Sequence, residues 1–181
     1  QEFSDLRRKS DRMAERYLRG KVDSGFRVDS VKTARALLRA GIPVVLEVPV
    51  YYGAWNHRIA DDLGIGRDME AWANGEVGYP EPGSMDYEHS NDEAAGHSIL
   101  IVGYDDDREV TTHVKMADGS VQTFHYRGAY IMKNSWGTEA FGRTFQADGE
   151  AYPGYGLITY KYAHEYGSFY RFPLRVSQTD N

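Results

Sequence analysis

A histidine and an asparagine, each at the end of a predicted β-strand, are the side chains in this sequence best suited to carry out chemistry. His97 opens the apolar segment 97–104, and Asn134 closes the segment 128–134. If these two strands pair antiparallel, the first residue of one lies beside the last residue of the other, at one edge of the sheet. The carboxamide oxygen can then accept the N–H of one ring nitrogen, which leaves the other nitrogen free to act as a base.

Trp136 follows this asparagine by two residues and is expected to shield the hydrogen bond from water. A lower local dielectric strengthens such a bond. The arrangement prepares a proton acceptor for a nucleophile. The sequence contains no cysteine, so it supplies no thiol nucleophile, disulfide or thiolate metal ligand of its own.

The order of predicted elements indicates an α+β fold with a curled antiparallel sheet. Two helices come first, and most of the strands follow. The first predicted helix covers 5–18, and the second begins after the cap Asp29-Ser30 and ends at Gly41. A short helix is predicted at 66–73, and a turn or short helix at 161–166. The predicted strands cover 43–50, 97–104, 109–115, 121–125, 128–134, 155–160 and 168–172, and Ala117-Asp118-Gly119 forms a hairpin turn.

Composition narrows the classes of function. A chain of 181 residues with 41% hydrophobic side chains can bury a core as one domain or two small lobes. The net charge of −6 provides no basic surface for nucleic acid, and no apolar run approaches the roughly 18 residues that a membrane-spanning helix needs. No metal site or cofactor is expected, because His57, His89, His113, His125 and His164 lack metal-ligand spacing, although His113 and His125 could face each other across the hairpin.

The segments Gly96–Tyr104 and Tyr130–Gly137 resemble the histidine and asparagine signatures of the papain family of cysteine peptidases. The similarity extends backwards to 35–48 and forwards to 154–160, and in outline it covers 22–172. This resemblance implies that residues 21–181 form the family's C-terminal, β-rich lobe, with a curled antiparallel sheet or barrel and a few helices. Residues 1–20 would then be a helix belonging to the first lobe or to a linker.

The resemblance also implies a role for each matching position. His97 would be the catalytic base and the imidazolium partner of a thiolate, Asn134 would orient it, and Trp136 would shield the pair, supported by Gly96 and Ser135. Val45 falls where the family has a wall of the substrate-binding pocket. Such enzymes hydrolyse peptide bonds of polypeptide substrates by thiolate attack, through an acyl-enzyme.

The spacing departs from the family pattern in one respect. Papain-type enzymes carry the histidine about 130–150 residues after the nucleophilic cysteine, and only 96 residues precede His97. The nucleophile half is therefore expected on a separate chain, on a segment outside this sequence, or nowhere. The first two cases describe a cysteine peptidase, and the third describes a catalytically inactive binding or regulatory module. In all three, the exposed cleft face predicts pairing with a cysteine-bearing chain or lobe, or self-association.

Overall fold

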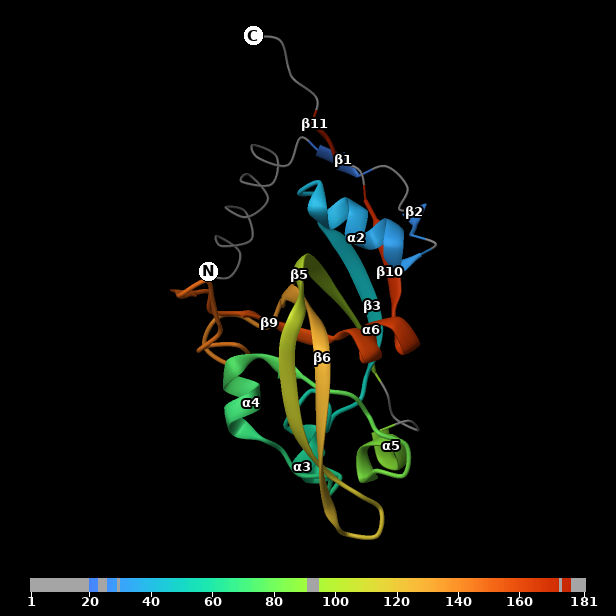
Figure 1. Cartoon of the computed structure of the whole chain (residues 1–181), viewed down its shortest axis with the longest axis vertical. Helices are drawn as coiled ribbons and strands as arrows, with labels where there is room; N and C mark the ends of the chain where they lie inside the picture. The colour runs from blue at the N-terminus through green and yellow to red at the C-terminus, as the bar shows by residue number, and fades with distance from the viewer. Residues whose placement is uncertain (1–19, 23–25, 29, 91–94, 173, 177–181) are drawn as a thin grey trace, which may run out of the picture.

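The computed structural model describes residues 20–22, 26–28, 30–90, 95–172 and 174–176. It combines short helices with one large seven-stranded sheet (Figure 1), which confirms the predicted α+β class. The helix predicted within residues 1–20 lies outside the described residues. The strands of the large sheet, in spatial order, are β2 (Phe26–Arg27), β10 (Ser168–Arg171), β3 (Val44–Val50), β5 (Ala95–Lys115), β6 (Val121–Lys133), β9 (Tyr155–Thr159) and β4 (Glu76–Val77).

The sheet differs from the expected curled antiparallel barrel in two ways. Its described strands do not close into a barrel, because β2 and β4, two residues long each, end the sheet without pairing with one another. The pairing of β4 with β9 is also parallel, whereas the other neighbouring strands are antiparallel. The remaining elements are the pairs β1 (Gly20–Val22) with β11 (Leu174–Val176) and β7 (Gln146–Ala147) with β8 (Glu150–Ala151), and the helices α2 (Val31–Arg39), α3 (Ile59–Asp62), α4 (Met69–Asn74), α5 (Met85–Ser90) and α6 (Tyr160–Tyr166).

Helix α2 forms as its local sequence predicts. The Ser30 side chain caps it by accepting a hydrogen bond from the Thr33 amide at 3.1 Å. Ala34 and Leu38 lie one turn apart and are both buried. Gly41 follows the helix with a φ of 72°, a conformation that favours glycine over any residue with a Cβ.

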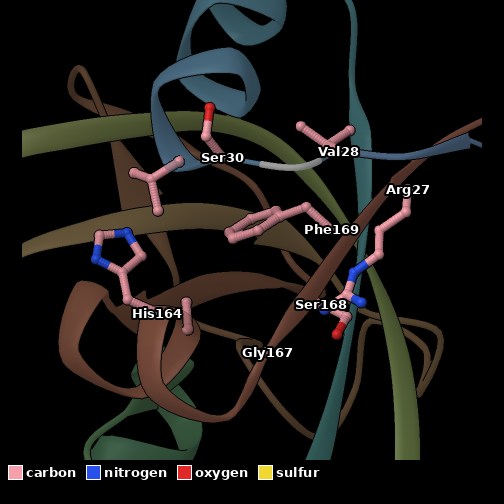
Figure 2. Close-up of a pocket in the computed structure, with 9 residues that line it drawn as sticks. Arg27, Val28, Ser30, His164, Gly167, Ser168 and Phe169 are labelled. Carbon is pink, nitrogen blue, oxygen red and sulfur yellow. The ribbon is translucent and has the colours of Figure 1, made fainter.

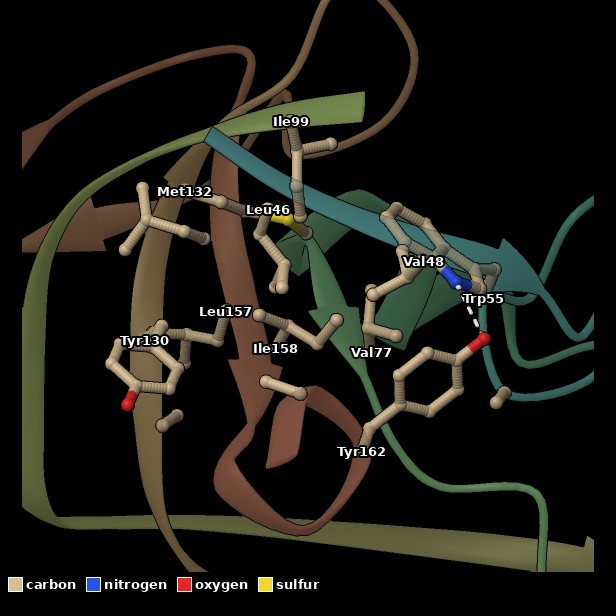
Figure 3. Close-up of a cluster of buried hydrophobic side chains, with 14 of the residues drawn as sticks. Leu46, Val48, Trp55, Val77, Ile99, Tyr130, Met132, Leu157, Ile158 and Tyr162 are labelled. Carbon is tan, nitrogen blue, oxygen red and sulfur yellow. Dashed lines mark hydrogen bonds between the residues drawn. The ribbon is translucent and has the colours of Figure 1, made fainter. Parts of the chain in front are cut away.

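Strand β3, predicted at 43–50, lies inside the sheet between β10 and β5. Its burial alternates: one face carries Val44, Leu46, Val48 and Val50, all buried, and the other face carries more exposed side chains. The buried face is part of the hydrophobic core, to which α2 and α6 also contribute. Figure 3 shows Leu46 and Val48 of this face near Tyr162 of α6. The core side chains of several strands meet there.

Strands β5 and β6 form a long hairpin, which joins the separate strands predicted from the sequence into two continuous ones. The turn closes with a hydrogen bond from the Met116 amide to the Ser120 carbonyl at 2.8 Å. His113 pairs with Thr123 and His125 pairs with Thr111, so the two histidines are not directly opposite each other. Among the described residues there is no cluster of three or more potential metal ligands, and no helix is long and apolar enough to cross a membrane.

Two glycines offer a matched test of this packing. Gly119 and Gly142 both have positive φ, but a Cβ at Gly119 meets open space, whereas one at Gly142 would overlap the Tyr155 carbonyl oxygen. We expect Gly119→Ala to cost about 1–2 kcal/mol of unfolding free energy, the cost of the left-handed conformation. Gly142→Ala should cost at least about 3 kcal/mol, because a backbone group must also move. Urea unfolding of the two variants measures the difference, and equal costs would contradict the packing around Gly142.

Candidate active site

The antiparallel pairing of β5 with β6 brings the predicted histidine and asparagine together. In the register Leu100 pairs with Lys133 and Ile101 with Met132, so the start of β5 lies beside the residues that follow β6. The His97 Nε2 and Asn134 Oδ1 atoms are 2.9 Å apart, although the two residues are 37 positions apart in the chain. The main chain of Asn134 is fixed as well, because its amide donates to the Gly154 carbonyl at 3.0 Å.

A backbone amide determines the direction of this hydrogen bond. The Ser135 N–H donates to the same Asn134 Oδ1 at 2.8 Å. An amide group can only donate, so the atom that it contacts must be the carboxamide oxygen, and His97 Nε2 must also be a donor. Neutral His97 therefore carries its proton on Nε2 and a lone pair on Nδ1. Within the described part of the chain, Nδ1 has no hydrogen-bond partner, which leaves it available as a base.

Aromatic rings enclose the imidazole. Trp136 stacks on His97 with ring centroids 4.8 Å apart and an interplanar angle of 15°. Trp55, which is fully buried, meets the same imidazole edge-on at 5.5 Å. Both indoles exclude water from the vicinity of the His97–Asn134 pair, and Asn134 itself is only 8% exposed. The hydrogen bond thus lies in a low-dielectric setting that strengthens it.

The stacking continues away from the histidine. Trp136 stacks on Trp72 at 5.7 Å and 22°, and the Arg67 guanidinium lies 5.3 Å from the centroid of Trp72. Phe141 packs against the indoles of all three tryptophans. All three tryptophans of the chain therefore belong to one cluster around His97. Sequence reasoning missed Trp55 and Trp72, and the only signal for them was the presence of two tryptophans in a segment without periodicity.

The loop that carries Trp55 is held by two buried polar groups. The Asp86 carboxylate accepts hydrogen bonds from the Gly53 and Ala54 amides at 2.8 and 2.7 Å and from the Ser90 hydroxyl. Burial raises the pKa of Asp86 above its ordinary value, against the opposite effect of these three donors. The Tyr162 hydroxyl accepts from Trp55 Nε1 at 3.3 Å (Figure 3) and donates to the Pro49 carbonyl at 2.6 Å. The position of Trp55 is thus fixed by contacts from α5 and α6.

The structure does not bring every predicted site residue to the histidine. Ser135 contributes through its backbone amide, and Gly96 is exposed beside the histidine, where a Cβ would meet open space. Val45, the predicted pocket wall, lies on the opposite face of the sheet. His97 pairs with Val48, which belongs to the buried face of β3, whereas Val45 alternates to the other face. A substrate-binding role for Val45 remains a prediction.

Comparison with family models, with curated proteins and with solved structures finds no match to this chain. The interpretation of the site therefore depends on the geometry described above.

The direction of the hydrogen bond predicts the tautomer of His97. We expect two-bond ¹⁵N–¹H NMR spectra at neutral or higher pH to show Nε2 protonated and Nδ1 unprotonated in the neutral ring. In Asn134→Ala this preference should weaken or be lost, because the acceptor that Nε2 has among the described residues is removed. Asn74→Ala, which removes a surface hydrogen bond to Thr144, is the matched control. A neutral ring protonated on Nδ1 in the unaltered protein would contradict the assignment.

His57 predicts a dependence of stability on pH. Its ring lies 5.6 Å from Trp136, and burial, followed by the charges of Arg58 and Arg67, lowers its pKa below the usual value of 6.5. The unfolded chain then binds more protons than the folded chain, so stability is present above about pH 6.5 and is lost as the pH falls through the folded pKa.

We expect His57→Gln to remove part of this loss, so that the unfolding free energies of variant and unaltered protein converge as the pH falls from 7 towards 5. His164, whose pKa burial also lowers, accounts for a further part. His89→Gln, at an exposed position of α5, is the control. Urea unfolding at several pH values measures the effect, and a constant difference between His57→Gln and the unaltered protein would refute the prediction.

Proposed function

We propose that this chain supplies the histidine and asparagine of a papain-like cysteine peptidase, as the second lobe of that fold. The observation that carries the proposal is the 2.9 Å contact between His97 Nε2 and Asn134 Oδ1, together with the indole of Trp136 stacked on the imidazole. These contacts hold one tautomer and leave Nδ1 as the base. The sequence has no cysteine, so the thiol comes from a segment outside these 181 residues or from another chain.

The geometry supports a different role for each of the two side chains in catalysis. His97 Nδ1 accepts the thiol proton, and Asn134 Oδ1 keeps its hydrogen bond to Nε2–H in both the neutral and the charged ring. The thiolate attacks the substrate carbonyl carbon, and the imidazolium returns its proton to the leaving amine as the C–N bond breaks. A water molecule, deprotonated by Nδ1, then hydrolyses the thioester. General acid–base catalysis of this kind contributes about 10²–10⁴-fold.

An exposed apolar face of the sheet supports an interaction with another polypeptide. On β5, Leu100 and Val102 are 36% and 38% exposed, three and five residues after the histidine. On the neighbouring strand, Val45 lies opposite Leu100 and points to the same face. Apolar side chains gathered on a sheet face are typical of an interface. This face is opposite to the one that carries His97, so a partner docked on it, a second copy of this chain or another chain, would not itself form the cleft at Nδ1.

The test uses the complete polypeptide or complex in which this chain occurs. We expect it to cleave a fluorogenic peptide and to be inactivated by iodoacetamide. His97→Ala should lower kcat/KM by at least about 10³-fold, and Asn134→Ala by a smaller factor, because the ring keeps its base but loses its orientation. His89→Ala is the control.

Unchanged turnover in His97→Ala would refute the catalytic assignment. If the complete assembly contains no cysteine-bearing segment and turns over no peptide, yet binds peptides, the chain is a binding module that retains this site geometry.

A further inference from the structure

A cavity lies apart from the candidate active site, and neither His97 nor Asn134 lines it. Its volume is about 580 Å³, and it lies between residues 53–71 and the distal part of the β5–β6 hairpin. We call it the hairpin pocket. Ile65, Met69, Tyr79 and Val114 contribute its apolar walls. A smaller hollow of about 350 Å³ lies elsewhere, at the start of α2 beside Phe169 and His164 (Figure 2). A cavity of the larger size can enclose most of a small organic molecule.

Two cationic side chains line the hairpin pocket and have donors to spare. The Arg67 side chain is only 14% exposed, and its Nε donates to the Asn56 carbonyl at 2.8 Å. Its other described polar contact is NH1, 3.9 Å from a carboxylate oxygen of Asp61, whose side chain is 60% exposed. Lys115 Nζ donates to the Gly64 carbonyl at 2.9 Å, which leaves two more N–H groups.

The two carboxylates at this pocket are already engaged. Asp86 accepts from the Gly53 and Ala54 amides and from Ser90. Asp68 caps α4 through its Oδ1, which accepts from the amides of Glu70 and Ala71. The Thr112 hydroxyl also lines the pocket and is buried without a hydrogen-bond partner among the described residues, and the charged donors with unused capacity are those of Arg67 and Lys115. An anionic group on the ligand would satisfy them.

We propose that the hairpin pocket binds an organic carboxylate with an apolar body. The guanidinium of Arg67 matches a carboxylate in shape and charge, and Lys115 adds a second donor. The apolar body fills the space between the walls formed by Ile65, Met69 and Val114. This site is independent of the proposed peptidase chemistry, because none of its binding groups is His97 or Asn134.

The tryptophan cluster connects the pocket to the candidate active site. Arg67 lies over Trp72, which stacks on Trp136, which stacks on His97. Gly53, Ala54 and Asn56 line the pocket, while Trp55 between them contacts the imidazole. A carboxylate that binds Arg67 changes the charge next to Trp72. Tryptophan emission therefore reports binding, since the chain's three tryptophans all lie in this cluster.

The experiment titrates the chain with decanoate, with decan-1-ol and with acetate, below the micellar concentration of decanoate. Calorimetry and tryptophan emission measure affinity, and ¹⁵N–¹H NMR shifts of the Gly53, Ala54 and Val114 amides locate the site. We expect saturable binding of decanoate, at least about tenfold tighter than decanol, because the charged hydrogen bonds are lost in the alcohol. Acetate should bind far more weakly, since it lacks the apolar body.

Arg67→Met should weaken decanoate binding about tenfold or more and leave decanol binding nearly unchanged, with a smaller effect for Lys115→Met. Arg58→Met, at an exposed position of the same segment, is the matched control. Decanol that binds as tightly as decanoate, or shifts confined to other amides, would overturn the proposal. So would unchanged decanoate affinity in a folded Arg67→Met. If Arg67→Met fails to fold, the comparison of decanoate with decanol in the unaltered chain still decides.

Discussion

The hydrogen bond between His97 and Asn134 depends on a single antiparallel ladder. Because β5 and β6 run past each other in the register Ile101 with Met132, the side chain that opens one strand reaches the side chain that follows the other. The Ser135 amide then fixes the carboxamide, and the carboxamide fixes the imidazole. A shift of the register by one residue would place the two side chains on opposite faces of the sheet and separate the pair. The buried side chains of the ladder therefore determine the tautomer of His97.

The environment of this pair is built by segments remote from the ladder. Trp55 and Trp72 reach Trp136 from the chain between β3 and β5, and each stacked or edge-on ring pair contributes about 0.5–1.5 kcal/mol beyond its buried area. To place Trp55, the fold buries the carboxylate of Asp86, which is costly unless the group is hydrogen-bonded. Three donors to Asp86 offset that cost. The position of Trp55 beside His97 thus depends on the buried carboxylate of Asp86.

The pairing of β5 with β6 could be predicted from the sequence, but the aromatic side chains around His97 could not. Strand β3, helix α2 and the hairpin follow from local patterns, namely a continuous apolar run, a serine cap and a glycine turn. The His97–Asn134 contact follows from the antiparallel pairing of β5 with β6. The segment from 53 to 90 has no such periodicity, because long-range contacts such as those of Asp86 and Trp72 determine its structure. The expected barrel is absent because the strands that end the sheet are only two residues long. Val45 lies on the face opposite to the histidine because side chains alternate along β3. The resemblance to the papain family did not take this alternation into account.

The state of the imidazole distinguishes the two interpretations of this chain. A histidine that only fills space in a core needs no defined tautomer, and its second nitrogen is normally hydrogen-bonded when the ring is enclosed. Here Asn134 occupies Nε2, Trp136 covers the ring and Trp55 meets its edge, yet Nδ1 has no hydrogen-bond partner among the described residues. Nδ1 is therefore the ring nitrogen to which a proton donor from outside the chain can bind. An unoccupied Nδ1 on a half-buried ring of defined tautomer is the feature that the proposed general base requires.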